Sequence, residues 1–146
     1  MKDKKVIRGF TCGAFDLVHA GHILMFEECK NYCDYLIVGL QKDPSIDRGD
    51  KNKPIQTLKE REVILKSIKW IDEIIVYNDE EELYQILNNM WEMGTINVRI
   101  IGSDWKGKKF TGYNLPIKVI FNSRSHSYST SELRKRVYQS ELNKRP

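Results

Sequence analysis

Two histidines, His19 and His22, stand three residues apart on either side of Gly21, shortly after an apolar run. The first N–H groups of a helix have no partner inside the helix, so a helix N-terminus attracts anions. If a helix begins here, both imidazoles could donate hydrogen bonds to phosphate oxygens, more strongly when protonated. Gly21 would let a ligand approach the backbone closely. The spacing therefore predicts a phosphate-binding turn. The sequence gives no sign of a nearby serine or cysteine nucleophile that the histidines would activate.

A second anion site is predicted near the end of the chain, where Arg124 precedes Ser127, Ser129 and Thr130. Hydroxyl side chains suit the N-cap of a helix, and an arginine beside free helix amides can hold phosphate groups. The long polar segment 41–57 carries Lys51 and Lys53, which could close over a triphosphate and an acceptor. A loop of this length without its own structure is uncommon unless it has a function.

The elements that must position these residues follow from the apolar pattern. It predicts strands over 4–13, 34–40, 72–77, 96–102 and 117–122, and helices over 22–32, 58–70, 79–93 and 129–142. Strands that alternate with helices indicate a three-layer α/β/α sandwich around a parallel five-stranded sheet. Ligands of such sheets bind beyond the carboxyl ends of the strands. Functional residues should therefore lie in the windows 12–22, 41–53, 102–108 and 123–131.

The composition is that of one globular domain over residues 1–146. A net charge of +4 with interleaved lysines and glutamates does not indicate a nucleic-acid partner. The sequence has neither an apolar run of about 20 residues nor a signal-peptide core, so we expect a cytoplasmic protein with no membrane partner. Cys29 and Cys33 fit two reduced cysteines that pack a helix face better than half of a zinc site. Cys12 would also be reduced.

Four stretches of the chain are similar, in order, to motifs of one enzyme family. "GAFDLVHAGH" at 13–22 resembles the H-x-G-H signature of the nucleotidyltransferase superfamily, in the form that cytidylyltransferases have. "REVILKSIKWIDEII", "IIGSDWKGK" and "RSHSYSTSELR" resemble the family's later motifs. Together they cover most of residues 6–138, and the likeness is greatest to the bacterial glycerol-3-phosphate cytidylyltransferases.

The resemblance implies a Rossmann-like nucleotidyltransferase fold and a direct transfer reaction. An oxygen of a phosphomonoester, here sn-glycerol 3-phosphate, would attack the α-phosphorus of CTP in line and expel pyrophosphate, giving CDP-glycerol. Such an enzyme acts by positioning its substrates and neutralising charge. The resemblance also implies a homodimer and Mg²⁺ held mainly by the triphosphate, and no protein ligand set for a metal is visible.

The resemblance further implies roles for particular residues. Direct contact with the reacting phosphates is expected of His19, His22, Lys51, Lys53 and Arg61. Nucleotide binding is expected of Gly13, Ala14, Phe15, Asp16, Gly21, Gly102, Asp104, Trp105, Arg124, Ser127, Tyr128, Ser129 and Thr130. Within this set, the turn with Asp104 and Trp105 would shape the nucleoside pocket, and Asp16 would brace the long loop.

Two departures from the family pattern leave alternatives open. Ala14 stands where a threonine is usual, and the acidic "YNDEEELYQ" occupies a region where related enzymes tend to place a lysine near the acceptor. The acceptor could therefore be phosphoethanolamine, a sugar phosphate or FMN, and the nucleotide could be ATP. A non-catalytic nucleotide-binding module is the alternative from outside the enzymes. CTP or ATP supplied with a panel of phosphomonoesters separates these possibilities.

Overall fold

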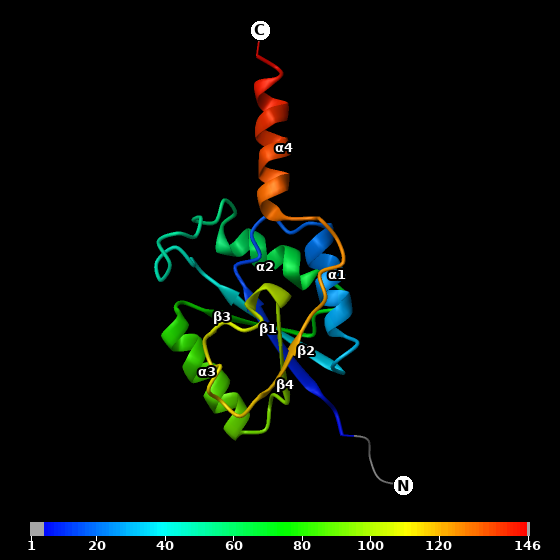
Figure 1. Ribbon diagram of the computed structural model, residues 1–146, viewed down its shortest axis with the longest axis vertical. Coiled ribbons are helices and arrows are strands. Elements are labelled where there is room, and N and C mark those ends of the chain that lie inside the picture. Colours follow the sequence, from blue (N-terminus) through cyan, green and yellow to red (C-terminus); the bar gives the residue numbers. More distant parts are fainter. Residues whose placement is uncertain (1–4, 146) are drawn as a thin grey trace.

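The computed structural model describes residues 5–145, in which strands and helices alternate as predicted. Strand β1 begins at Arg8, and Lys4, where the sequence pattern starts the strand, lies outside the described residues. The elements are β1 (Arg8–Gly13), α1 (Ala20–Cys29), β2 (Tyr35–Gln41), α2 (Leu58–Lys66), β3 (Glu73–Tyr77), α3 (Glu80–Glu92), β4 (Val98–Ile101), the 3₁₀ turn η1 (Ser103–Trp105), β5 (Lys118–Phe121) and α4 (Thr130–Leu142) (Figure 1).

All five strands are parallel, and their order across the sheet is β3-β2-β1-β4-β5. The chain adds strands outward on one side of β1 and then crosses to the other side to form β4 and β5. This reversal opens a crevice at the carboxyl ends of β1 and β4, which is where ligands bind in open α/β sheets. The predicted fold class, a parallel five-stranded sheet of the Rossmann-like kind, is confirmed.

Alternation along the buried strand β2 builds the layers on the two faces of the sheet. Leu36 belongs to a core cluster with Phe26 of α1 and Leu65 of α2. Its neighbour Ile37 points to the opposite face and belongs to a second cluster with Leu83 of α3. Helices α1 and α2 therefore cover one face and α3 covers the other (Figure 1).

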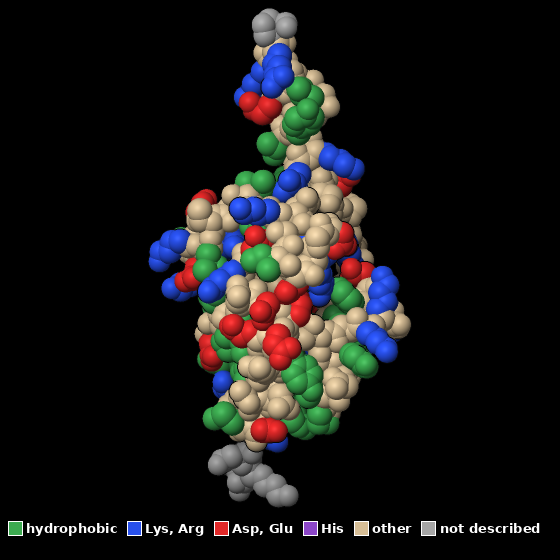
Figure 2. Space-filling model, turned by 90° about the vertical axis from the view of Figure 1, so that its left-hand side faces the viewer, with side chains coloured by type: hydrophobic (Ala, Val, Ile, Leu, Met, Phe, Trp, Pro, Cys, Tyr) green, Lys and Arg blue, Asp and Glu red, His purple; other side chains and the backbone are tan. Residues whose placement is uncertain are grey.

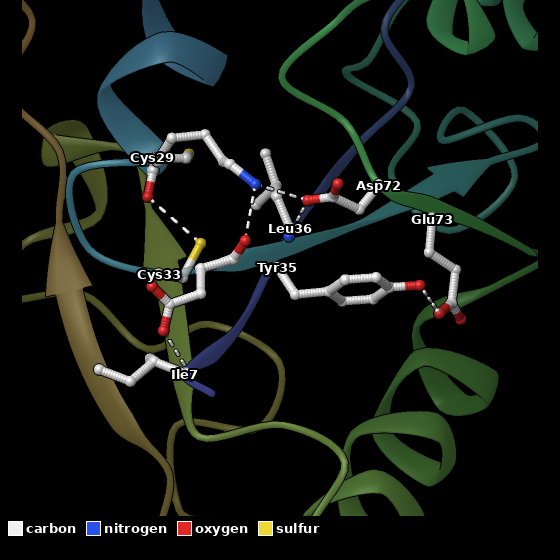
Figure 3. Close-up of polar contacts among 9 residues, drawn as sticks. Ile7, Cys29, Cys33, Tyr35, Leu36, Asp72 and Glu73 are labelled. Carbon is white, nitrogen blue, oxygen red and sulfur yellow. Dashed lines mark hydrogen bonds and ion pairs between the residues drawn. The ribbon is translucent and has the colours of Figure 1, made fainter. Parts of the chain in front are cut away.

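The amino edge of the sheet is held by a closed network of polar contacts (Figure 3). Lys30, just after α1, donates to Asp72 at 2.6 Å and to the Asp34 carbonyl at 2.8 Å. The Asp72 carboxylate also accepts the Leu36 N–H at 2.8 Å, and Asp34 accepts the Ile7 N–H at 2.8 Å. Asp72 belongs to the second family-like motif, so this part of the motif stabilises the fold, far from the carboxyl edge.

The cysteines of the α1 region are free and buried, as predicted. Cys33 donates its S–H to the Cys29 carbonyl at 3.3 Å, which closes the end of the helix (Figure 3). The loop predicted over 41–57 contains no helix or strand from residue 42 onward, but Gln41 is the last residue of β2. The loop runs along the carboxyl edge and reaches the crevice.

Helix α4 extends from the body of the protein at the end opposite the start of β1 (Figure 1). It buries none of its residues, and its hydrophobic and basic side chains lie exposed along its length (Figure 2). Val137 is 57% exposed and Tyr138 is 66% exposed. Across residues 5–145, no helix combines the length and the apolar character that a membrane span requires.

Candidate functional site

A cleft of about 510 Å³ lies at the carboxyl edge, between the N-termini of α1 and α4. Ten of the residues predicted from the sequence line it: His19, Gly21, His22, Lys51, Gly102, Asp104, Arg124, Tyr128, Ser129 and Thr130. They come from the four sequence windows that follow the strands. The structure thus brings together segments that are up to about a hundred residues apart in the chain.

The two histidines together form the N-terminal cap of helix α1. His19 is the N-cap residue, and its Nδ1 accepts the Gly21 N–H at 3.0 Å. The Nδ1 of His22 in turn accepts the His19 N–H at 3.1 Å. In a neutral ring whose Nδ1 accepts, the proton is on Nε2. Each histidine therefore holds its Nε2–H in a fixed orientation; that of His19 points to Thr130, and that of His22 is left for an anion.

The environment keeps both rings neutral at pH 7. Burial, followed by the nearby His19, lowers the pKa of His22 to about 4. Burial and the charges of His126 and Arg124 also lower the pKa of His19 below its usual value. The sequence left the protonation state of the rings open, and in the protein by itself the lowered pKa values favour the neutral rings, which are the weaker donors. An anion placed beside the rings would raise their pKa values again.

A hydrogen bond joins the two helix N-termini. His19 Nε2 donates to Thr130 Oγ1, the first residue of α4, at 3.2 Å. The N-cap of α4 is Ser129, whose side chain accepts the Glu132 N–H at 3.1 Å. Arg124 lies on the same rim, with its Nη2 donating to the Tyr128 carbonyl at 3.0 Å. The cleft is thus bordered by two helix N-termini and a guanidinium, which is a favourable environment for a polyphosphate.

His126 is a third histidine of the cleft that sequence reasoning missed. Its Nδ1 accepts the Tyr128 N–H at 3.1 Å, so its Nε2 carries the proton in the neutral ring. A Cβ on Gly21 would lie 2.8 Å from the Cε1 atom of His126 and 2.9 Å from that of His19. Both rings therefore lie directly on Gly21, which explains the need for glycine there. A histidine inside the stretch "RSHSYST" was the available signal.

The turn between β1 and α1 is strained in a way that fixes His22. Phe15 and Leu17 have φ angles of 49° and 52°, in the left-handed region that such side chains rarely adopt. Phe15 is buried and packs against Phe26 and against the edge of His22, with ring centroids 5.2 and 5.9 Å apart. Because packing holds this turn in place, the histidine that follows it has a defined position.

Asp16 braces the long loop, as predicted. Its two carboxylate oxygens accept the N–H groups of Ile55 and Gln56, each at 2.9 Å. Around this brace lies a pocket of about 220 Å³ that adjoins the cleft, and the predicted residues that line it are Ala14, Phe15, Asp16, His22, Lys51 and Thr130. Lys51 therefore belongs to both cavities. Lys53 lies on the same loop but lines neither.

Arg61 occupies a different position from the one expected of a phosphate ligand. Its side chain is 2% exposed. Its guanidinium donates to the carbonyls of Ala14, Gln41 and Lys42 at 2.9, 2.7 and 2.6 Å. These bonds tie the turn after β1 to the end of β2. The geometry assigns Arg61 a positioning role behind the cleft in place of direct contact.

Three more predicted residues lie beside the cleft and not in it. Gly13 and Trp105 line a separate pocket on the α3 side of the sheet, and Trp105 stacks there on the guanidinium of Arg48, 5.1 Å away. Ser127 borders a pocket of about 330 Å³ at the base of α4. The two residues of the turn predicted to shape the nucleoside pocket therefore line different cavities. Asp104 lines the cleft, and Trp105 lines the separate pocket on the α3 side of the sheet.

The described residues fit a magnesium ion that is held mainly by a nucleotide. No group of three histidine, cysteine or acidic side chains within 5–145 is arranged to hold a metal. Both oxygens of Asp16 are engaged by backbone N–H groups. Asp104, at the cleft, could add one carboxylate to an ion that triphosphate oxygens and water coordinate.

Comparison with known proteins agrees with this geometry. Residues 10–136 match the family model described as cytidylyltransferase-like. The chain is 32% identical over 135 residues to the glycerol-3-phosphate cytidylyltransferase of Bacillus subtilis (strain 168), covering 92% of this chain and 97% of that enzyme. It is 36% identical over 133 residues to the protein of the same name from Bacillus spizizenii (strain ATCC 23059 / NRRL B-14472 / W23), covering 90% and 95%.

Other relatives are longer or more distant. The bifunctional protein HldE of Aliarcobacter butzleri (strain RM4018) is 30% identical over 139 residues, which are 94% of this chain but 28% of that protein. The chain therefore spans little more than a quarter of this relative. A crystal structure of the lipopolysaccharide core biosynthesis protein from Thermoplasma volcanium GSS1 has the same fold, with a TM-score of 0.65 and 24% identity over 84% of this chain and 100% of that one. The match to the family model and the two near-full-length relatives show that the chain belongs to the cytidylyltransferase-like family.

Proposed function

We propose that this protein transfers a cytidylyl group from CTP to a small phosphomonoester, with sn-glycerol 3-phosphate as the first candidate acceptor. The observation that carries the proposal is the convergence of two helix N-termini on one cleft, joined by the bond from His19 to Thr130. A triphosphate placed there would meet Nε2–H donors, free helix amides and the guanidinium of Arg124. Relatives named glycerol-3-phosphate cytidylyltransferase, matched over nearly their whole length, support the choice of acceptor.

In this mechanism the protein's side chains position the two substrates and neutralise the charge that develops during the transfer. The Nε2–H of His22 would donate to an oxygen on the α-phosphorus, where charge increases as the acceptor oxygen attacks, and His19 would exchange its bond to Thr130 Oγ1 for a second such oxygen. Arg124 and the N-terminus of α4 would hold the leaving pyrophosphate. Lys51, which lines both the cleft and the adjoining pocket, would lie between the nucleotide and the acceptor phosphate and reduce their repulsion. Mg²⁺ on the triphosphate would supply further charge neutralisation.

The experiment that tests this proposal measures pyrophosphate release with CTP or ATP in the presence of glycerol 3-phosphate, phosphoethanolamine, a sugar phosphate or FMN. We expect turnover that requires CTP and an acceptor, with CDP-glycerol as the product. Release with ATP alone among the nucleotides would overturn the cytidylyl assignment. Tight CTP binding without turnover for every acceptor would favour a nucleotide-binding module.

We also propose that the protein is a homodimer in the cytoplasm. Helix α4 supports this proposal, because it extends from the body and leaves Val137 and Tyr138 exposed. A second copy could cover these side chains. Light scattering after size exclusion would give about twice the 17.2 kDa mass of one chain, and substitution of both residues by serine would reduce it to one.

A further inference from the structure

We propose that His126 is a third phosphate-binding histidine of the cleft, which donates its Nε2–H to the β-phosphate of the nucleotide and stabilises the negative charge that the leaving pyrophosphate acquires. This inference rests on the proposed function and deepens it. It is carried by the position of the His126 ring over Gly21, beside His19, and by a ring nitrogen that forms no hydrogen bond within residues 5–145.

The segment between β5 and α4, which carries His126, is fastened along helix α1 (Figure 1). At the start of the segment, the two oxygens of the Glu28 carboxylate accept from the N–H and the Oγ of Ser123, each at 2.8 Å. Just beyond its end, Thr130 accepts the hydrogen bond from His19 at 3.2 Å. Because the segment is tied to both ends of α1, it holds His126 at the first turn of that helix.

One half of the His126 ring forms a turn within the segment, and the other half is not needed for it. The Nδ1 atom accepts the Tyr128 N–H at 3.1 Å, which is the one hydrogen bond of this ring within residues 5–145. Asparagine and aspartate side chains form the same kind of turn by accepting an N–H two residues further on. The turn therefore requires an acceptor close to the backbone but not the Nε2–H on the far side of an imidazole. That donor is available to a ligand in the cleft, which His126 lines.

His126 and His19 lie over the same glycine. A Cβ on Gly21 would lie 2.8 Å from the Cε1 atom of His126 and 2.9 Å from that of His19. Burial is the first cause that lowers the pKa of His19, and the charge of His126 is the second, so the two rings are close enough to repel each other as cations. An anion placed between them would remove this repulsion. The pair therefore favours a phosphate group that reaches both rings.

The surroundings of His126 indicate which phosphate it would contact. The proposed mechanism places His19 at the α-phosphorus. The same mechanism gives Arg124, two residues before His126 on the same segment, and the N-terminus of α4 to the leaving pyrophosphate. A donor that lies beside His19 and belongs to the segment of Arg124 would meet the β-phosphate, which links the reacting phosphorus to the rest of the leaving group.

The transfer reaction gives this contact a catalytic effect. As the acceptor oxygen forms its bond to the α-phosphorus, the bond from the α-phosphorus to the bridging oxygen breaks, and its electron pair stays on the pyrophosphate. A fixed donor at the β-phosphate stabilises this charge more in the transition state than in the bound nucleotide. His126 keeps its proton throughout, so the step requires no other reactant.

The test measures the Kd of CTP, CMP and inorganic pyrophosphate by calorimetric titration, and kcat by pyrophosphate release, in the full chain. In His126→Asn, the short amide can still accept the Tyr128 N–H but does not reach the position of Nε2. In His126→Gln, the amide N–H reaches about as far as Nε2. His126→Ala removes both groups. Ser125→Asn is the matched control, because Ser125 is exposed on the same segment and lines none of the cavities described above.

We expect His126→Ala and His126→Asn to weaken the binding of CTP and pyrophosphate by about 10-fold and to lower kcat by about 10- to 100-fold, as for the loss of one hydrogen bond to a charged group. CMP has no β-phosphate, so its Kd should stay within about threefold of the wild-type value. His126→Gln should recover most of both losses, and Ser125→Asn should match wild type.

An asparagine variant that behaves as wild type would show that the turn alone accounts for His126. An equal loss of CMP affinity, or a glutamine variant no better than the asparagine variant, would also overturn the assignment. A wild type that binds CTP but releases no pyrophosphate with any acceptor would contradict the proposed function, and the comparison of CTP with CMP would still decide whether His126 contacts the β-phosphate.

Discussion

The two edges of the sheet use polar side chains in opposite ways. At the amino edge, Lys30, Asp72 and Asp34 form a network in which one cation faces two oxygen acceptors and each carboxylate also accepts a backbone N–H (Figure 3). At the carboxyl edge, donors outnumber their acceptors. His22 keeps an Nε2–H for a ligand, and Arg99 and Gln41 have donors without partners.

This difference distinguishes polar groups that stabilise the fold from polar groups that are available to a ligand. Satisfied groups add modestly to stability and gain nothing from a ligand, whereas an unpaired donor in a cavity costs free energy until a ligand accepts from it. Position at the carboxyl edge does not by itself make a polar group functional. Asp72 at the amino edge and Arg61 at the carboxyl edge belong to one family-like motif, and both are held by hydrogen bonds within the protein.

The largest effect is expected from His22→Ala. Loss of a preorganised donor at the reacting phosphorus should lower kcat about 10²- to 10⁴-fold, with a much smaller change in the Kd for CTP. Pyrophosphate release at saturating substrates measures the first and calorimetric titration the second. Asp72→Asn, at the opposite edge, serves as the control and should keep its kcat. Equal losses in both variants would show that the contrast between the edges is wrong.

Arg61→Leu should reduce the free energy of unfolding by about 3 kcal/mol or more. It leaves the carbonyls of Ala14, Gln41 and Lys42 without their buried donor. Urea denaturation measures the loss, and Arg61→Lys should recover part of it. A leucine variant of unchanged stability that loses only kcat would instead indicate that the guanidinium contacts the substrate.

Stability should fall as the pH is lowered from about 6.5 to about 4. Unfolded His22 binds a proton near pH 6.5, whereas burial holds its pKa in the folded protein at about 4. The unfolded state therefore binds more protons in this window, and the free energy of unfolding decreases by up to roughly 3 kcal/mol from this group. His22→Asn, which offers an acceptor at a similar position, should flatten the decrease. Parallel pH curves for variant and wild type would refute the assignment.

The smallest effect is expected from Asp72→Asn, which should lower the free energy of unfolding by about 1–2 kcal/mol at pH 7. Burial tends to raise the pKa of Asp72, but hydrogen bonds from Lys30 and the Leu36 N–H lower it overall. Its contribution is therefore present above the unfolded pKa near 4 and is lost as the pH falls through the lower folded value. Thermal unfolding at a series of pH values from 7 downward would show a difference that shrinks as the pH falls below about 4. A difference that stays constant down to the acid limit of folding would mean that the charge of Asp72 is not what stabilises this edge.

Much of the fold and the site could be predicted from local sequence. Apolar periodicity located the five strands and the four α-helices but not the 3₁₀ turn η1, because the period of two or 3.6 residues is set by the backbone and a single short turn has no period. Their alternation gave the parallel sheet, and the ligand edge followed from it. His19, His22 and Thr130 were found because residues after strands converge there. Element ends were less accurate, as for α2, which ends at Lys66 where Ser67 caps it.

Tertiary structure alone decided which side chains are free to act. Sequence gives the charge of Arg61 and of Arg99 but not their partners, and these differ: Arg61 donates to three carbonyls behind the cleft, whereas Arg99 donates to the Thr111 carbonyl and lines a cavity, and the Nε of each has no partner. The sequence also does not show that His22 is neutral, because this depends on burial by residues distant in the chain. Residue type and spacing are local properties, but hydrogen-bond partners and desolvation come from long-range packing. For that reason the sequence predicts where a phosphate would bind, and only the folded molecule shows which groups are free to bind one.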